Sequence, residues 1–447
     1  MTAPSAAGLA AATPVTRDRY VDALRVFALA GVIMGHFIMA VVEWAPGEPI
    51  SFTNILAVEP WTRWGTLLLQ VMPIFFVVGG FSHAVAWRSL ARRGGGHADF
   101  VAARIGRLVR PALVYVAVWT VLSLIVTAAG WTQLDPVLQI LGQLLWFIGI
   151  YLIAAAFAPL LLRAHERFGL GAIAALVLAV VAVDVVRLAG GVEAAGWLNF
   201  AFVWLAIHQL GFFYADGVAD RVGPRRLGAG LLGVGAIALV LLITVGPYGI
   251  SMVSYAGEEL SNLAPPTVAL LAFAVAQAGV VLLLRGRARA WLAKPRVWTA
   301  VIVAGSMAMT AFLWHFTALV AVNGAYWWLG PDTSPVPGSA QWWWVKLAML
   351  LPYLLVVVAL VLVFRRFDRP PPRADAVGPR AWRTAVAAVG VAAAIVGMIG
   401  YAAVGFRGIT DLYSVSIAGV PLTSAGSLLL VTASAVLTAV AVRTRGR

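Results

Sequence analysis

The sequence contains no cysteine, which excludes disulfide bonds, thiolate catalysis and thiolate metal sites. Charged residues are also scarce, since they make up only 11% of the chain, about half of their usual share in soluble proteins. Histidine occurs only six times and never with the spacing of a zinc-binding pair, so we expect no metal site. Residues 1–16 lack the basic and apolar regions of a signal peptide, and we expect them to form a disordered tail.

Apolar residues are abundant instead: they form 62% of the chain, and the mean hydropathy is +0.92. Apolar segments of about 17–27 residues, long enough to cross a bilayer as helices, recur along the chain. The sequence therefore predicts an all-α polytopic membrane protein with about twelve transmembrane helices. We place these helices at residues 20–42, 65–90, 108–129, 137–162, 170–189, 198–215, 227–246, 266–284, 298–324, 343–364, 383–405 and 418–442.

The basic residues predict how these helices are oriented. Both termini and alternate loops hold all but four of the 32 Lys and Arg residues, the exceptions being Arg63, Arg187, Lys346 and Arg407. By the positive-inside rule this side is cytoplasmic, so the net charge of +14 reflects membrane topology rather than nucleic-acid binding. We expect a multi-pass protein of the plasma or cytoplasmic membrane with both termini in the cytoplasm.

A Pro- and Arg-rich segment at residues 365–382 predicts a cytoplasmic linker. It separates a ten-helix body at residues 17–364 from residues 383–447, which hold two more helices and a short basic tail. These two helices contain almost no polar side chains, and we expect them to be an appendage to the body.

The first apolar segment carries ionisable residues at membrane depth. Arg25 and His36 are eleven residues apart, which in an α-helix places them on one face about 16 Å apart along the axis. We expect Glu43 to continue this face, two turns beyond His36 at the outer end. Such groups are costly in a bilayer and usually face a protein interior, so they are candidates for function. The alternative is structural: a histidine bonded to a neighbouring helix, and an arginine that pairs with Asp22 or reaches the headgroups.

A run of arginines lies where the chain enters the third predicted helix. Arg104, Arg107 and Arg110 recur at three-residue intervals and therefore sweep one side of a helix. Arginine binds phosphate groups in a fork, which would suit a phosphate-bearing substrate. The alternative is that these residues only mark the cytoplasmic side.

Three further histidines fall within predicted helices. We expect His315 near the depth of His36, where it could orient an imidazole, help position a substrate or form a core hydrogen bond. His83 and His208 are candidates for lining the same site.

Five tryptophans flank the ninth and tenth predicted helices on the outer side. Tryptophan is enriched where helices meet the membrane surface, so we interpret these residues as an interfacial belt. Stacking on a sugar ring is the alternative. The five residues are Trp327, Trp328, Trp342, Trp343 and Trp344.

Five short patterns follow one another over residues 17–364. They are Arg19-Tyr-Val-Asp22-Ala-Leu-Arg25 with His36, Pro73-Ile-Phe75-Phe76-Val-Val-Gly79-Gly80-Phe81, Arg104-Ile-Gly-Arg107-Leu-Val-Arg110-Pro111, Leu145-Trp146-Phe147 and Leu313-Trp314-His315. In this order they resemble the motifs of the acyltransferase 3 family, integral-membrane enzymes that O-acylate sugars and other envelope or small-molecule acceptors. Gly79 stands where the family has a serine.

The resemblance implies a membrane O-acyltransferase of the cell envelope. Such an enzyme would move an acyl group, acetyl being one candidate, from acyl-CoA to a hydroxyl of a glycan, a glycolipid or a glycosylated metabolite. Acyl-CoA would be a cosubstrate, and no tightly bound cofactor is implied. His36 suits the role of general base or transient acyl carrier, because its ordinary pKa is near neutral. The proposed donor-binding residues are Arg25, Arg104, Arg107 and Arg110, and the possible lining residues are His315, His83, His208, Trp146 and Glu43.

The alternative function is a proton-coupled transporter, in which His36, Asp184 and His315 form a proton relay. It explains twelve helices equally well. The clustered cytoplasmic arginines and the ordered motifs favour the enzyme.

Overall fold

The computed structural model describes Gly8 and residues 12–14, 17–43, 50–330, 335–368, 380–410, 412–417 and 419–443. Within them, twelve helices are long and apolar enough to cross a membrane, so the protein is an all-α multi-pass membrane protein, as predicted. Most of the predicted tail at residues 1–16, most of the predicted linker at residues 365–382 and the last four residues lie outside the described residues.

The chain divides into two compact units. The first contains residues 1–35, 60–86 and 158–308, and the second contains residues 36–59, 87–157 and 309–447. Four helices begin in one unit and end in the other: α2 (Arg19–Met39), α5 (Met72–Ala91), α8 (Leu145–Phe168) and α15 (Ala308–Leu329).

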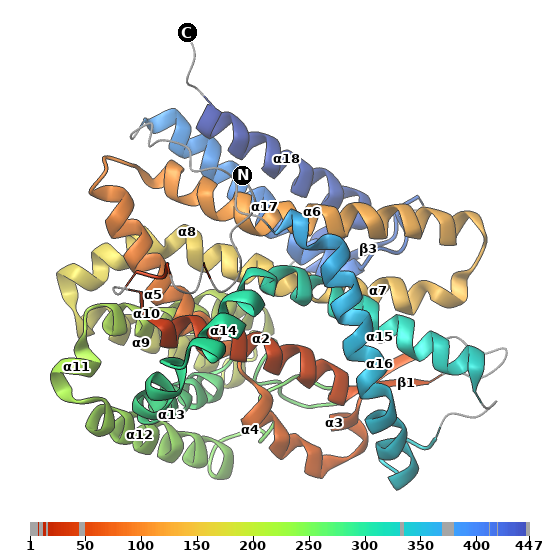
Figure 1. Cartoon of the computed structure of the whole chain (residues 1–447), viewed down its shortest axis with the longest axis horizontal. Helices are drawn as coiled ribbons and strands as arrows, with labels where there is room; N and C mark the ends of the chain where they lie inside the picture. The colour runs from red at the N-terminus through yellow and green to blue at the C-terminus, as the bar shows by residue number, and fades with distance from the viewer. Residues whose placement is uncertain are drawn as a thin grey trace. The chain divides into compact units, whose positions relative to one another are not determined.

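The first unit contains helices and connecting loops, but no β-strand, in its described residues. Besides its parts of α2, α5 and α8, it contains η1 (Pro60–Gly65), α4 (Thr66–Leu69), α9 (Leu170–Leu188), η3 (Glu193–Leu198), α10 (Asn199–Ala215), α11 (Val218–Val222), α12 (Pro224–Thr244), α13 (Val268–Leu292) and α14 (Pro295–Ser306). Helices α12 and α13 lie side by side (Figure 1). Their backbones meet at Gly235, where an added Cβ would collide with the backbone of Ala276.

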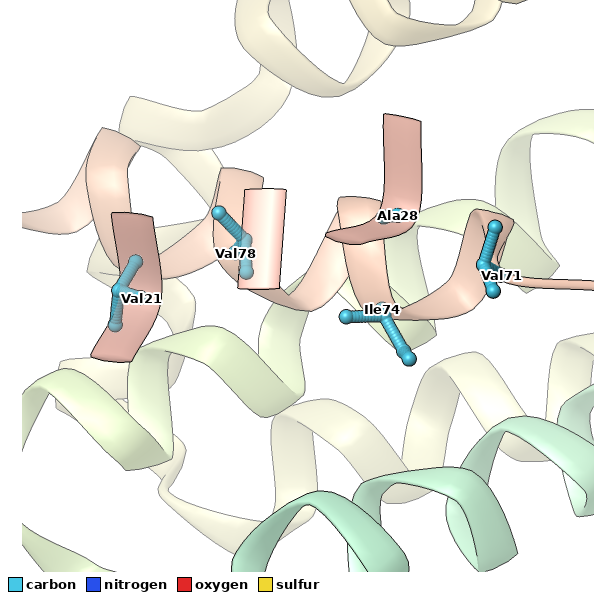
Figure 2. Close-up of a cluster of buried hydrophobic side chains, with 5 residues drawn as sticks. All are labelled: Val21, Ala28, Val71, Ile74 and Val78. Atoms are coloured by element: carbon cyan, nitrogen blue, oxygen red, sulfur yellow. The ribbon is translucent and has the colours of Figure 1, made fainter. Parts of the chain in front are cut away.

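Helix α2 starts at a side-chain cap and packs on α5. Asp18 Oδ1 accepts hydrogen bonds from the backbone N–H groups of Tyr20 and Val21, which the helix itself cannot pair. Val21 and Ala28 of α2 then meet Ile74 and Val78 of α5, together with Val71 just before it (Figure 2). Arg25 lies on α2 between Val21 and Ala28, so this apolar contact sets its position.

Helices α5 and α10 cross at two glycines. An added Cβ on Gly80 would collide with the carbonyl oxygen of His208, and one on Gly211 would collide with the backbone of Val77 and Phe81. Close backbone approach at small residues is the usual way for helices to associate in a membrane. The close packing of these two helices explains why position 80 in the second motif is a glycine.

The second unit holds the other helices and two short antiparallel hairpins. Strand β1 (Ala40–Glu43) pairs with β2 (Ser51–Asn54), and β3 (Ser414–Ile417) pairs with β4 (Val420–Thr423). The helices are α3 (Ile55–Val58), α6 (His97–Ala128), η2 (Thr132–Leu134), α7 (Asp135–Gln143), α15 (Ala308–Leu329), α16 (Ala340–Phe364), η4 (Arg365–Phe367), α17 (Ala381–Val404) and α18 (Ser424–Arg443), of which α15 starts one residue before the unit does.

The last two helices, α17 and α18, run alongside α6 (Figure 1). Arg383 of α17 is fully buried; it donates to a carboxylate oxygen of Asp99 at 2.8 Å and to the carbonyl oxygen of Ala441 at 2.6 Å. At the far end of α17, the backbone of Phe406 bonds to Leu138 and to the hydroxyl of Ser123. These two helices are therefore packed into the unit at both ends of α17.

Three predicted helices are interrupted. The second, at 65–90, is divided into α4 and α5 at Gln70 and Val71, the fourth, at 137–162, into α7 and α8 at Leu144, and the ninth, at 298–324, into α14 and α15 at Met307. The predictions were wrong here because an apolar run shows no break in its hydropathy when a chain turns inside other apolar residues.

Candidate active site

His36 and His315 form a direct pair. His36 lies in the last turn of α2, His315 lies two turns into α15, and Nδ1 of His36 is 3.0 Å from Nε2 of His315. The two rings are stacked with an interplanar angle of 24°. His315 is fully buried, whereas His36 is partly buried. The structure thus brings together two of the histidines that the sequence had singled out.

The partners of the two rings determine where their protons lie. Nδ1 of His315 faces the carbonyl oxygen of Phe312, which can only accept, so this nitrogen carries a proton. When His315 is neutral, its Nε2 has a lone pair, which can accept from Nδ1–H of His36 at the observed distance. Nε2 is therefore the basic nitrogen of a neutral His36. His315 orients that imidazole as a third group orients the base in nucleophile–base arrangements.

Aromatic rings surround the pair. Phe316 packs edge-on against His36 with a centroid distance of 4.8 Å, and Phe312 contacts His315 at 5.8 Å. Phe147 packs against Phe312 at 5.0 Å, and Trp146 packs on Phe147. The Leu-Trp-Phe motif of α8 therefore supports the pair through Phe312. Apolar surroundings strengthen the hydrogen bond between the imidazoles because water competes less.

The carboxylate of Asp368, which lies far from α15 in the sequence, caps the start of the helix that carries His315. Asp368 Oδ2 accepts from the backbone N–H of Thr310 at 3.1 Å and from its hydroxyl at 3.2 Å. Such a cap satisfies N–H groups that the first turn of α15 leaves unpaired. Burial raises the pKa of Asp368, while the bonds from Thr310 and the charge of Arg107 oppose that rise. Asp368 thereby fixes the first turn of α15 at Thr310, which lies five residues before His315.

Lys346 caps the end of the helix that carries His36. Its ammonium group donates to the carbonyl oxygen of Phe37 at 3.2 Å and lies over the rings of Phe37 and Trp342 at 5.2 and 5.1 Å. The last carbonyls of a helix lack intrahelical partners, and a cation there also interacts favourably with the helix dipole. Because Phe37 follows His36, Lys346 steadies the turn that carries the imidazole.

Glu43 does not continue the helical face of His36. Helix α2 ends at Met39, and Glu43 is the last residue of β1, where it pairs with Ser51 of β2. The prediction was wrong because two β-branched residues, Val41 and Val42, follow the helix and a second strand is available to pair with them. Glu43 is exposed and lines a pocket together with Lys346.

Arg25 lies in the part of α2 that belongs to the first unit. It donates to Ser82 Oγ at 2.8 Å and to Asp22 Oδ1 at 3.3 Å, so the expected pair with Asp22 is confirmed. Ser82 donates its own proton to the carbonyl oxygen of Val78 on α5. The Arg25 side chain stays 28% exposed, so an anion can reach it.

The three predicted arginines lie in the first half of α6, in the second unit. Arg104 is partly buried and lies over the ring of Phe100 at 5.1 Å. Arg107 and Arg110 are exposed, and Arg107 is near enough to act on the carboxylate of Asp368. Their exposure leaves Arg107 and Arg110 accessible to a phosphate-bearing ligand.

His83 and His208 form a second buried pair, in the first unit. Nδ1 of His83 is 3.0 Å from Nε2 of His208, and Nδ1 of His208 has no hydrogen-bond partner among the described residues. The glycine crossing of α5 and α10 brings these two rings together. The structure places them against each other, in a different unit from His36.

The hydrogen bonds of Asp184 hold helices together. Its carboxylate accepts from the side chains of Asn199 and Tyr248 and from the backbone N–H of Val268, at 2.8 to 2.9 Å. These bonds join α9 to α10 and to the start of α13.

Ser82, Lys346 and Asp368 contribute to these arrangements but were not predicted as site residues. Ser82 lies just beyond the second motif, where only three-dimensional contact with Arg25 distinguishes it. Lys346 had a usable signal, since it is a basic residue within a span on the side that holds few basic residues. Asp368 lies in a segment whose composition predicted only a linker.

Comparison with known families identifies the class of protein. A family model described as an acyltransferase domain matches residues 18–366, more than half of the chain. The protein is therefore a membrane-embedded acyltransferase, which makes it an enzyme rather than the alternative transporter. It belongs to the acyltransferase 3 family, as its ordered motifs predicted. A search of curated proteins and a search of solved structures gave no match.

Proposed function

We propose that this protein transfers an acyl group from acyl-CoA, held on the cytoplasmic side, to a hydroxyl of a glycan, a glycolipid or a glycosylated metabolite. The observation that supports this assignment best is the contact between His36 and His315. It supplies an oriented imidazole whose basic nitrogen is Nε2, the group that hydroxyl acylation requires. The donor could carry acetyl or another acyl chain.

In the proposed reaction, Nε2 of His36 takes the proton of the acceptor hydroxyl as its oxygen attacks the thioester carbonyl carbon. A C–O bond forms and the C–S bond breaks, and the imidazolium returns its proton to the departing thiolate. The sum is an ester and free coenzyme A. If His36 instead carries the acyl group, Nε2 attacks the carbonyl carbon, a C–N bond forms, the C–S bond breaks and coenzyme A leaves as a thiolate. In the second step the acceptor oxygen attacks, a C–O bond forms, the C–N bond breaks, and the hydroxyl proton neutralises the thiolate.

The donor phosphates are assigned to arginines. Arg25 precedes His36 by eleven residues on the one helix α2, about 16 Å by the helical rise. An extended pantetheine arm is of comparable length. Arg107 and Arg110 are exposed on α6, and Arg104 lies beside them, so these side chains are further candidates for phosphate contacts.

The test is release of free thiol from acyl-CoA by purified wild-type protein and by His36→Ala. We expect His36→Ala to lower the rate by about 10²–10⁴-fold, as for loss of a general base. His97→Gln is the control, because the hydrogen bond of the His97 ring is to the carbonyl oxygen of Ala156 and not to His36 or His315. Unchanged thiol release in His36→Ala would overturn the assignment.

A further inference from the structure

The part of the chain beyond the matched acyltransferase domain, which ends at residue 366, supplies a side chain to the core of the second unit. Phe406 lies two residues beyond the end of α17 and is fully buried. Its backbone N–H donates to the carbonyl oxygen of Leu138 on α7 at 2.8 Å, and its carbonyl oxygen accepts from the hydroxyl of Ser123 on α6. The backbone of Phe406 is therefore fixed to both helices.

Gly405 allows this close approach. It has a φ of +73°, a conformation that residues with a side chain rarely adopt, and an added Cβ would collide with the backbone of Gln139. The chain can therefore turn sharply after α17, and the next residue, Phe406, enters the interior of the unit.

Two aromatic residues of α6 pack on Phe406. Tyr115 and Trp119 are four residues apart, so they share one face of the helix. Both are buried, and their ring centroids lie 5.9 and 6.4 Å from that of Phe406. The hydroxyl of Tyr115 also donates to the carbonyl oxygen of Leu141 at 2.9 Å. Removal of the Phe406 ring would therefore leave a cavity beside both side chains.

The same two residues contact α15 on either side of His315. Tyr115 packs edge-on against Trp314, the residue before His315, with a centroid distance of 5.3 Å. Nε1–H of Trp119 donates to Oγ1 of Thr317, two residues after His315, at 3.2 Å. The segment of α15 that carries the imidazole is therefore held at two points by one face of α6.

We infer that Phe406 is a positioning residue for the histidine pair and acts on α15 through Tyr115 and Trp119. Protein interiors are close-packed, so the loss of a ring on one side of these two side chains lets them shift, and α15 with them. Such a shift changes the alignment of His315 with His36, whose Nδ1 it contacts. That this alignment serves acyl transfer rests on the proposed function; the alignment itself does not.

The test observes the histidines directly. The chain has only six of them, so full-length protein labelled with ¹⁵N-histidine in lipid bilayers gives imidazole signals that single histidine variants can assign. Solid-state NMR separates protonated from unprotonated ring nitrogens and so shows which nitrogen of His36 carries the proton. In the wild type we expect one tautomer of His36, protonated on Nδ1.

Phe406→Ala should convert the His36 signals into those of a mixture of both tautomers. It should also lower kcat for thiol release about tenfold, with the KM for acyl-CoA unchanged, since a misplacement of about 1 Å caused far from the chemistry can cost about 100-fold in rate. Phe406→Leu, which refills most of the space, should recover part of both effects.

Phe212→Ala is the matched control. Phe212 is also fully buried, but it belongs to the first unit, and its ring contacts His208 of the other histidine pair at a centroid distance of 5.1 Å. This variant should change the signals of His208 and leave those of His36 and His315 as in the wild type.

Thr317→Val tests the same path without a large cavity, which matters if Phe406→Ala does not fold. It removes the acceptor of Trp119 with little change in volume, and it should also produce both tautomers of His36. Unaltered His36 and His315 signals in Thr317→Val and in folded Phe406→Ala would overturn the inference. A change of these signals in Phe212→Ala as large as that in Phe406→Ala would overturn it as well.

Thiol release measured in parallel distinguishes this inference from the proposed function. Altered His36 signals with wild-type thiol release would refute the part of His36 in the proposed function alone. Thiol release that depends on His36, with His36 signals that none of the Phe406 and Thr317 variants alters, would refute the positioning role alone.

Discussion

At the scale of single residues, the feature that matters most for the proposed reaction is which ring nitrogen of His36 carries the proton. Nε2 of His36 is basic because Nδ1 of the same ring donates to His315, and His315 in turn donates to a backbone carbonyl. A histidine without such a partner would distribute its proton over both nitrogens. His315 therefore has the part of a positioning residue in the proposed reaction.

His315→Ala should lower kcat about 100-fold, because a misoriented base loses alignment with the hydroxyl proton. The KM for acyl-CoA should stay close to that of wild type. His315→Gln should recover part of the rate, since its amide oxygen can still accept from Nδ1–H of His36. If His315 orients His36, His315→Ala should also shift the pH dependence of kcat, which a merely structural role would leave unchanged. A wild-type kcat in His315→Ala would contradict this prediction.

Ser82 should act through Arg25. Ser82→Ala removes the oxygen that Arg25 contacts at 2.8 Å, so the guanidinium loses one of its restraints. We expect the KM for acyl-CoA to rise about tenfold with a small change in kcat, as for loss of one hydrogen bond to a charged group. Ser82→Thr keeps the hydroxyl and is the control. A rise of similar size in both variants would assign the effect to packing instead.

At the scale of elements, helices are fixed at their ends by residues far away in the sequence. Asp368 caps the start of α15, and Lys346 caps the end of α2. The two imidazoles that these helices carry are 279 residues apart along the chain. Each cap satisfies backbone groups that the helix cannot pair, and each therefore holds one imidazole in place.

The sequence could predict which residues were suitable for the site but not which of them meet. Membrane depth distinguished His36 and His315, because an ionisable group in a span is unusual. It also distinguished His83 and His208, which belong to a separate pair. Helical periodicity placed Glu43 wrongly, since no periodicity reveals where a helix gives way to a strand that pairs with a later segment.

The buried ion pair between Arg383 and Asp99 should stabilise the packing of α17 on α6. Their side chains are 0% and 8% exposed. Arg383→Met leaves a buried carboxylate unpaired, and we expect it to lower the free energy of unfolding by about 3–5 kcal/mol. Thermal unfolding in nanodiscs measures this loss.

The double variant Arg383→Met with Asp99→Asn is the control for that measurement. It removes both charges, so it should lose less stability than the sum of the two single variants. Additive losses would mean that the pair contributes nothing of its own.

At the scale of the whole molecule, the distribution of basic residues predicts a cytoplasmic N-terminus and C-terminus. Twelve spans agree with both termini on one side. The predicted spans came from hydropathy and could be located well, because a bilayer demands length and apolarity from each helix. The packing of the last two helices on α6 was not predictable, because it depends on residues such as Arg383 and Asp99, which are 284 positions apart.

The absence of cysteine makes this orientation directly measurable, since the natural chain gives no background in thiol labelling. Glu259→Cys should react with a membrane-impermeant maleimide in intact cells, and Arg226→Cys only after permeabilisation. Both positions are exposed. The reverse labelling pattern would mean that the protein has the opposite orientation in the membrane, with the donor arginines on the outer side.

The crossing of α5 and α10 has a consequence for evolution. Gly80 and Gly211 occupy one contact, where a side chain on either would displace the backbone of the other helix. Neither position can therefore drift alone, although 131 residues separate them. In aligned homologues that keep this crossing, both columns should hold glycine or change together, and a member that carries a larger residue at one of them should have a rebuilt second histidine pair.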